Sequence, residues 1–321
     1  MTQTDSLPNR PRRVDLLREF QQVLQKVGMP GVEARWILTY VLGIDDQAFT
    51  TKLLEPVPFD VEEAARAILA LRLKGQPLQL LLGETEFYGL RLKVKRGVLI
   101  PRPETEGLVE LALQLPRPLT AYPLEMPAAA KVLDVGTGSG AIAIAFKHMR
   151  SGAEVWASEI NPVALDLARQ NAERLGLEIN FLEGAYTAGL SQLELIISNP
   201  PYLPEGFRHE APPELSYEDD RALYSGHDGL EMPRELVRHA WTALLPGGWL
   251  VLELAPANIY VLLAEMAELG WRDLRVSRDL NQRPRYLVAQ KPPLPFRVAD
   301  DSDLVVDHEY WHQDKKGLGD W

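Results

Sequence analysis

The chain has 321 residues, of which 46% are apolar and 25% are charged, and its formal net charge is -11. This length can hold two domains with sizeable cores, and the acidic balance disfavours a protein that binds nucleic acid through charge alone. The absence of cysteine excludes a disulfide framework and a cysteine nucleophile. No apolar stretch approaches the ~20 residues of a membrane span, and the first residues lack the apolar core of a secretory signal, so we expect a cytoplasmic protein.

Residues 1–80 are predicted to form an N-terminal helical domain. Apolar residues recur at helical spacing in three segments, and each segment is followed by residues that stop a helix. These segments are residues 14–28, 34–42 and 60–74. We expect Asp60 and Glu63 to form a capping box at the start of the third helix, and Trp36 and Tyr40 to lie in the core of the domain.

Residues 81–101 are predicted to link this domain to the rest of the chain. The segment 83–94 alternates in polarity and is punctuated by glycine, which indicates a β-hairpin whose second strand runs to Leu99. A helix is then expected from Glu104, and a proline-rich loop over residues 115–130.

From Lys131 the sequence alternates between strand and helix patterns, which predicts an α/β fold with a doubly wound sheet. The expected strands are residues 132–135, 154–157, 179–182, 193–197, 249–254, 271–277 and 286–290. The expected helices are residues 141–148, 162–175, 231–244 and 257–269. Residues 102–291 are therefore the second expected domain, and the acidic, proline-rich residues 292–321 are a tail.

A glycine-rich loop joins the first of these strands to its helix. It reads Asp134-Val135-Gly136-Thr137-Gly138-Ser139-Gly140, and Glu159 follows at the end of the next strand. Glycine lets the backbone approach a ligand, the helix N-terminus presents free N–H groups, and Glu159 can accept hydrogen bonds from ribose hydroxyls. A phosphate loop or a structural turn stays open as an alternative. The spacing is similar to the S-adenosylmethionine loop of class I methyltransferases, which implies that Asp134 lies near the methionine end of the cofactor.

The apolar strand at 193–197 is stopped by Asn199-Pro200-Pro201-Tyr202. Two prolines remove two backbone donors and fix two φ angles, so neither a strand nor a helix continues. The rigid segment suits a planar NH2 group, because Asn199 Oδ1 and the Pro200 carbonyl can accept its hydrogens while Tyr202 covers its face. We expect Asn199, Pro200 and Tyr202 to be catalytic and Pro201 to complete the substrate site. A plain strand-ending turn is the alternative.

The two motifs are expected to face each other. Their strands would be neighbours at the switch point of the sheet, where both open at their carboxyl ends. Asn199 is therefore also expected to contact the cofactor.

Together the motifs resemble the protein-(glutamine-N5) methyltransferases of peptide chain release factors, the HemK/PrmC family. Further segments that match sequence motifs of that family are residues 75–79, 83–89, 99–106, 222–223, 226–230 and 245–248. The resemblance covers residues 12–291. It implies a class I S-adenosylmethionine-dependent methyltransferase fold and transfer of a methyl group to the glutamine of the release factor's Gly-Gly-Gln motif. It also implies that the helical domain helps to dock this substrate.

The resemblance implies two further points about the site. Tyr186 falls where the family commonly places an aromatic that packs on the cofactor, whereas Ala185 departs from the acidic residue that the family often has there. We expect release factors as partners, no direct nucleic-acid or membrane partner, and a monomer.

Other functions are compatible with parts of the sequence. A glutamine methyltransferase of a ribosomal protein would use the same chemistry, although the sequence of residues 101–106 favours release factors as the substrate. An adenine-N6 methyltransferase would use the same tetrapeptide, but the chain lacks a basic segment interleaved with aromatics. A cofactor-binding scaffold is the non-enzymatic alternative. Residues 308–312 match the H-E-x-x-H pattern of zinc proteases, yet they stand in the acidic tail without a third ligand, so no metal is expected.

Overall fold

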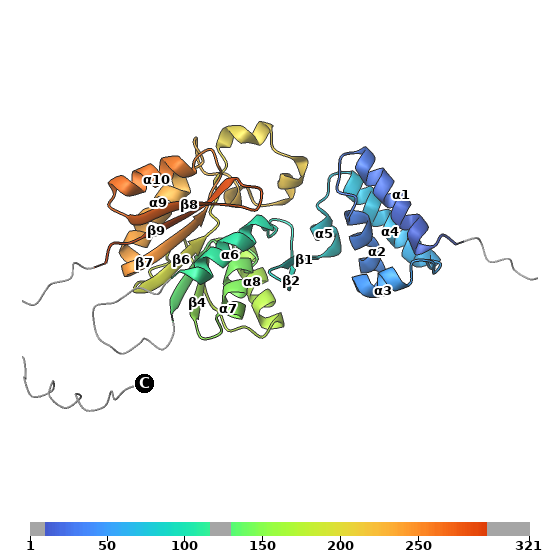
Figure 1. The fold of residues 1–321 in the computed structure, drawn as a ribbon, viewed down its shortest axis with the longest axis horizontal. Coiled ribbons are helices and arrows are strands. Elements are labelled where there is room, and N and C mark those ends of the chain that lie inside the picture. Colours follow the sequence, from blue (N-terminus) through green and yellow to red (C-terminus); the bar gives the residue numbers. More distant parts are fainter. Residues whose placement is uncertain (1–9, 116–129, 294–321) are drawn as a thin grey trace, which may run out of the picture.

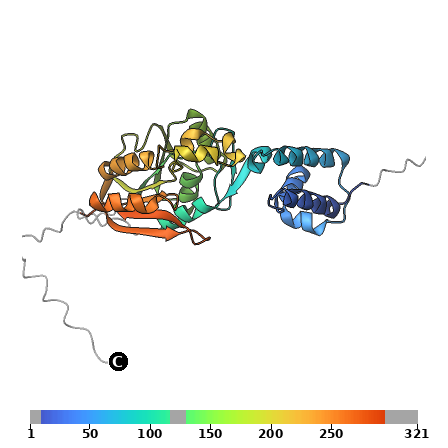
Figure 2. The same ribbon diagram turned by 90° about the horizontal axis from the view of Figure 1, so that it is seen from above.

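The computed structural model describes residues 10–115 and 130–293 of the chain. It has an N-terminal group of helices and a larger α/β part, and a β-hairpin lies between them (Figures 1 and 2). The larger part is a mostly parallel sheet with helices on both faces, which confirms the expected doubly wound fold. Nearly all of the loop expected at 115–130 lies outside the described residues, as do the tail from residue 294 and its H-E-x-x-H segment.

In the described residues, the helical part consists of five helices around a core of its own. They are α1 (Arg13–Lys26), α2 (Glu33–Leu42), α3 (Asp46–Thr51), α4 (Phe59–Leu73) and α5 (Leu78–Leu82). Fully buried Phe20, Ile37 and Phe49 come from three different helices and pack in one cluster, to which α4 and α5 also contribute. None of the helices in 10–115 and 130–293 is long and apolar enough to cross a membrane.

The expectation that Trp36 and Tyr40 lie in the core is wrong. Their exposed fractions are 46% and 47%. The face of α2 that packs into the core carries Ala34, Ile37 and Leu38. Because of the helical period, Trp36 and Tyr40 lie on a different face. These two aromatic side chains therefore lie on the surface of the helical part.

Two other details of this part differ from the prediction. The helix α4 begins one residue earlier than expected, after Pro58, so Asp60 lies in its first turn and forms no capping box with Glu63. The short helices α3 and α5 were not expected from the apolar pattern. The N-terminus of α3 is capped by Asp45, whose side chain accepts from the Ala48 N–H at 2.7 Å.

The hairpin consists of β1 (Glu84–Phe87) and β2 (Leu90–Lys93). Its two-residue turn, Tyr88-Gly89, has φ angles of 52° and 72°, the combination that matches the twist of a hairpin. The second strand ends at Lys93 rather than at Leu99, because Lys93 pairs with Glu84, the first residue of β1, and the described residues provide no partner strand beyond it.

The α/β part is built on a seven-stranded sheet in the order β5-β4-β3-β6-β7-β9-β8. The strands are β3 (Lys131–Val135), β4 (Glu154–Glu159), β5 (Asn180–Glu183), β6 (Leu193–Ser198), β7 (Leu244–Glu253), β8 (Arg272–Arg278) and β9 (Pro284–Gln290). β9 is antiparallel to both of its neighbours, and the other pairs are parallel. The chain winds from β3 out to β5 and returns to β6 on the other side of β3, so the β3–β6 pair is the switch point of the sheet.

Helices cover both faces of this sheet. They are α6 (Glu104–Gln114), α7 (Ala141–Met149) and α8 (Pro162–Arg174) on one face, and α9 (Glu231–Ala243) and α10 (Ile259–Glu268) on the other. The central strands are apolar on both sides, as buried parallel strands must be. In β6, Leu195 and Ile197 pack toward α6 and α7, whereas Ile196 packs toward α9 and α10.

Candidate active site

The glycine loop follows β3 and opens at the carboxyl edge of the sheet. Gly138 and Gly140 have φ angles of 57° and 88°, which side chains disfavour. A Cβ atom at Gly140 would also lie 3.2 and 3.3 Å from the Cβ and Cα atoms of Ala168, so the close packing of α7 on α8 favours glycine. The Gly136 N–H donates to the Ser158 carbonyl at 2.8 Å, which fixes the loop to the end of β4.

Asp134 is buried beneath this loop. Its Oδ2 accepts from the Thr137 hydroxyl at 2.6 Å and from the Ala143 N–H at 3.1 Å, while its Oδ1 has no hydrogen-bond partner. Burial, opposed by these two hydrogen bonds, raises the pKa of Asp134 to about 7. Asp134 therefore ties the loop to the first turn of α7, and it keeps one buried oxygen for which the described residues supply no donor.

Glu159 ends β4 on the other side of the loop. Its Oε2 accepts from the Gly138 N–H at 2.9 Å, and its Oε1 accepts from the Asn161 N–H at 2.9 Å. Each carboxylate oxygen can accept a second hydrogen bond, so Glu159 can hold the loop and still accept from a ligand hydroxyl.

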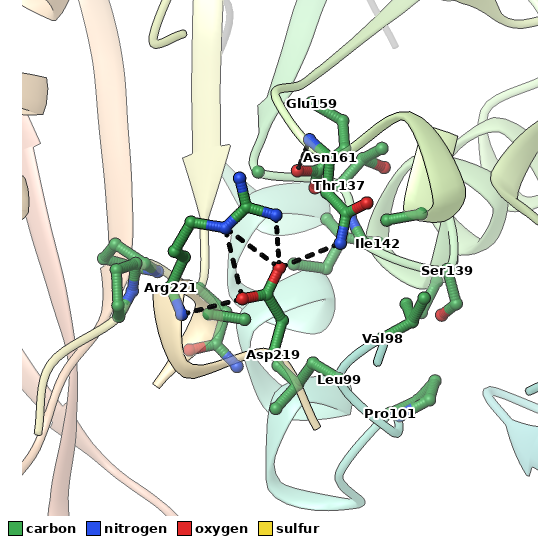
Figure 3. Close-up of a pocket in the computed structure, with 18 of the residues that line it drawn as sticks. Val98, Leu99, Pro101, Thr137, Ser139, Ile142, Glu159, Asn161, Asp219 and Arg221 are labelled. Carbon is green, nitrogen blue, oxygen red and sulfur yellow. Dashed lines mark hydrogen bonds and ion pairs between the residues drawn. The ribbon is translucent and has the colours of Figure 1, made fainter. Parts of the chain in front are cut away.

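The segment after β6 forms one wall of a pocket at this edge. It contains the short helices η1 (Glu205–His209), η2 (Pro213–Tyr217) and η3 (Asp220–Ala222). Asp219 lies between Arg221 and Asn161 (Figure 3), and it accepts from Arg221 Nη2 at 2.8 Å and from Asn161 Nδ2 at 2.9 Å. Burial opposes the shift, but these hydrogen bonds hold the pKa of Asp219 below its ordinary value, so this wall carries an ion pair between Asp219 and Arg221.

The remaining lining is mostly apolar. Val98 and Leu99 come from the segment after the hairpin, Ile142 from α7 and Ala164 from α8. A flat apolar group can therefore be enclosed on these sides, with polar groups at the glycine loop, at Glu159 and at Asp219.

The end of β6 lies next to the glycine loop. Ile197 pairs with Asp134 in the sheet, and the Ser198 hydroxyl donates to the Val135 carbonyl at 2.7 Å. Asn199-Pro200-Pro201 then lines the same pocket as residues 136–139 and Glu159. The structure thus brings together the two motifs that the sequence separates by about 60 residues.

Four of the expected site residues do not line this pocket. Asp134 and Gly140 lie behind the loop. The carbonyl of Tyr202 accepts from Asn258 Nδ2 at 3.0 Å, and burial raises the pKa of its hydroxyl to about 12. The ring of Tyr186 stacks on His239, with centroids 4.5 Å apart and planes 9° from parallel. The expected contacts of Tyr202 with the substrate and of Tyr186 with the cofactor stay predictions.

Other pocket residues were missed from the sequence. Asn161 could have been found, because Asn-Pro after a strand signals a helix N-cap next to Glu159. Asp219 and Arg221 gave no such signal, since their segment reaches the pocket only through the tertiary fold. Thr105 belongs to residues 99–106, which carry the family resemblance, but no role in the site was expected of it. Across residues 10–115 and 130–293, no group of three or more His, Cys, Asp or Glu side chains could hold a metal ion.

Comparison with known families agrees with this architecture. Residues 119–211 match the Methyltransferase small domain, and residues 15–83 match the PrmC N-terminal domain. The fold and the first of these matches define the chain as a methyltransferase.

Two relatives define the family more closely. The release factor glutamine methyltransferase of Deinococcus radiodurans is 44% identical over 280 residues, which are 86% of this chain and 98% of the relative. The release factor glutamine methyltransferase of Geobacter sulfurreducens is 38% identical over 253 residues, which are 78% of this chain and 86% of the relative. The chain belongs to the release factor glutamine methyltransferase family.

A solved structure supports the fold alone. The hMettl16 catalytic domain, in complex with MAT2A 3'UTR hairpin 6, has a TM-score of 0.50 and 15% sequence identity, and the match covers 71% of this chain and 80% of that chain.

Proposed function

We propose that this protein transfers a methyl group from S-adenosylmethionine to the side-chain amide nitrogen, N5, of the glutamine in the Gly-Gly-Gln motif of class I peptide chain release factors. Membership of the family supports this reaction. The observation that carries it is that the glycine loop, Glu159 and Asn199-Pro200 line one pocket. A loop suited to the cofactor and acceptors suited to an amide NH2 are thus neighbours on adjacent strands.

The pocket residues fit S-adenosylmethionine. Glu159 would accept from the ribose hydroxyls, because each of its oxygens already accepts one backbone N–H and retains capacity for another bond. Val98, Leu99 and Ala164 would pack against the adenine. Asp134 lies behind the loop and would act on the methionine end only indirectly, by holding Thr137 and the first turn of α7 in place. When bound, the cofactor supplies a methyl group on a positively charged sulfur.

The chain itself would mainly orient and desolvate the substrate amide. An amide nitrogen is a poor nucleophile because its lone pair is delocalised, so much of the catalytic effect must come from alignment. Asn199 Oδ1 and the Pro200 carbonyl would accept the two N–H hydrogens and stabilise the positive charge that develops on nitrogen. The methylated amide nitrogen then loses a proton readily, so a strong base is not needed. Tyr202 would cover the amide plane.

We divide the chain into a helical domain (residues 1–80), a hairpin linker (81–101), a methyltransferase domain (102–291) and a tail (292–321). The helical domain would recognise the substrate protein. Arg72 of α4 donates to Glu214 of η2 at 2.7 Å, which connects the helical part to the loop that forms the pocket wall. A release factor seated against both parts would present its glutamine at Asn199. We propose that the enzyme acts as a cytoplasmic monomer without direct contact to nucleic acid, in keeping with its net charge of -11.

The test is methyl transfer from labelled S-adenosylmethionine with three acceptors in parallel: a class I release factor, a ribosomal-protein extract and DNA. We expect label on the release factor, located by mass spectrometry at the Gly-Gly-Gln glutamine and absent when that glutamine is replaced by alanine. Label on a ribosomal protein or on DNA, with none on the release factor, would refute the proposal.

A further inference from the structure

Asn199 is held by a residue from a distant segment. Its Nδ2 donates to Thr105 Oγ1 at 3.2 Å, and in the described residues no donor is hydrogen-bonded to its Oδ1. Thr105 lies in the first turn of α6, is only 4% exposed and lines the pocket beside Asn199. Thr105 belongs to residues 99–106, a segment that matches the family's sequence motifs, yet the proposed reaction assigns Thr105 no role.

A buried carboxyl group stands behind Thr105. Glu253 ends β7 and is 1% exposed, and its Oε2 has no hydrogen-bond partner. The side chains of Thr105 and Tyr202 are close enough to lower its pKa as hydrogen-bonding groups. Asn199, Thr105 and Glu253 therefore form a chain of polar groups that leads from the pocket into the interior, in surroundings where an unmatched donor or acceptor is costly.

The number of protons on these three polar groups determines which group donates and which accepts in each hydrogen bond. A threonine hydroxyl has one proton to donate. If it donates to the ionised Glu253, which can only accept, its oxygen can only accept from Asn199. The Asn199 amide must then turn Nδ2 toward Thr105, which leaves Oδ1 for the pocket.

We propose that Thr105, backed by Glu253, is a positioning residue that fixes the rotation of the Asn199 amide so that Oδ1 points at the substrate. This inference rests on the proposed function, in which Oδ1 accepts from the glutamine NH2. With the amide rotated by 180°, two donors would face each other and the substrate nitrogen would lose its alignment. Such a misplacement costs roughly 10- to 100-fold in kcat.

The charge state of Glu253 provides a second test. Burial is the main cause that raises the pKa of Glu253 to about 7. The negative charge of Glu104 raises this pKa further, whereas Thr105, Arg285 and Tyr202 lower it. Tyr286, which pairs with Glu253 across β7 and β9, also faces it, and burial raises the pKa of the Tyr286 hydroxyl to about 12. The carboxyl of Glu253 therefore changes charge near neutral pH. Once protonated, Glu253 can donate to Thr105 and free the threonine proton for Asn199 Oδ1, so kcat should rise as pH increases through about 7.

The first experiment compares Thr105→Val with Thr105→Ser in the full-length protein. Valine keeps the shape of threonine but has no hydroxyl, whereas serine keeps the hydroxyl. We expect kcat to fall roughly 10- to 100-fold in Thr105→Val and to recover in Thr105→Ser, with the affinity for S-adenosylmethionine unchanged in both. If the valine variant fails to bind cofactor, Thr105→Ala takes its place.

The same change is then made in an Asn199→Ala background. If Thr105 acts through Asn199, its loss should have no further effect on kcat there. A purely structural role would lower kcat by the same factor in both backgrounds, and that result would overturn the proposal. Unchanged kcat in Thr105→Val would also overturn it, whereas a wild-type protein that does not methylate the release factor would instead refute the proposed function.

The second experiment measures the pH profile of kcat in Glu253→Gln. The glutamine side chain does not ionise, so we expect a lower kcat that no longer rises through pH 7. The matched control is Glu194→Gln, a buried glutamate near the start of β6, at the end of that strand away from Asn199, which should retain the wild-type profile. A Glu253→Gln profile that still rises as in wild type would exclude Glu253 from the positioning chain.

Discussion

Arg72 and Glu214 join the helical part of the molecule to the wall of its pocket. Arg72 Nη1 donates to Glu214 Oε1 at 2.7 Å, while its Nε and Nη2 donate to Glu33 at 2.6 and 3.1 Å. The guanidinium is buried, and Glu214 is half-exposed on η2. Because Glu214 and the pocket residue Asp219 belong to one short segment, a shift of the helical part can be transmitted to the pocket wall.

Glu214→Ala should therefore weaken the use of a whole release factor. Arg72 keeps its pair with Glu33, so the fold should lose only about 1 kcal/mol, as for a partly exposed ion pair. We expect kcat/KM for the intact release factor to fall roughly 3- to 10-fold, because the helical part no longer sits firmly against η2. The matched control is Glu210→Ala, an exposed glutamate of the same segment. Equal rates for the two variants would show that the ion pair does not affect substrate alignment.

Asn199→Ala should separate cofactor binding from turnover. The loop and Glu159 remain in place, so the affinity for S-adenosylmethionine should change little. Turnover should fall by ~10²-fold or more, because the acceptor for the developing charge on nitrogen is lost. Calorimetry and single-turnover methylation measure the two quantities. Turnover close to wild type would remove Asn199 from the reaction.

Glu159→Ala should act on the cofactor instead. We expect the affinity for S-adenosylmethionine to fall by ~1.5–3 kcal/mol, the scale of hydrogen bonds to a charged group. Turnover at saturating cofactor should change little. Glu183, at the end of the neighbouring strand, pairs with Glu159 in the sheet but does not line the pocket, so Glu183→Ala is the matched control. Unchanged affinity in Glu159→Ala would refute the ribose contact.

Asp134 should make stability depend on pH. Burial raises its pKa from an ordinary 3.8 to about 7, so the folded protein binds this proton more tightly than the unfolded chain does. The stabilisation is complete below about pH 4 and is lost as pH rises through about 7, with a total on the order of 4 kcal/mol. The free energy of unfolding of wild type minus that of Asp134→Asn should thus decrease between these values. An unchanged difference would contradict the buried, shifted carboxyl group, and Asp166→Asn on the exposed side of α8 is the control.

The fold and the proximity of the two motifs could be predicted, because both depend on local patterns. The glycine loop and the proline stop after β6 are contiguous motifs, and the rules of parallel sheets place them side by side. Tertiary contacts decided the rest. Thr105 reaches Asn199, and Asp219 reaches Asn161, from segments far away in the chain, and no local pattern indicates these contacts. Trp36 was predicted to be buried because it is an aromatic residue in an apolar helix, yet the neighbouring Ile37 and Leu38 fill the core. Residue type alone therefore gave the wrong burial for Trp36.

Removing residues 1–82 should separate recognition from chemistry. The buried cluster of the helical part lies within residues 16–82, whereas the two large clusters of the α/β part begin at Phe87, so the cut divides no core. The loop, Glu159 and Asn199 remain, and we expect the truncated protein to bind S-adenosylmethionine as the full chain does. Circular dichroism and calorimetry check that it is folded and competent.

Methylation of an intact release factor by the truncated protein should fall steeply in kcat/KM. One glutamine side chain offers little binding energy, and contacts far from the reacting amide are what position it. A short Gly-Gly-Gln peptide cannot reach the helical part, so it should be a poor substrate for both forms, by similar margins. Glu214→Ala should fall between wild type and the truncated protein, because it loosens the contact without removing the surface. If the folded, cofactor-binding truncated protein methylates the release factor at the full-length rate, the helical part is a stabilising cap and not a recognition module.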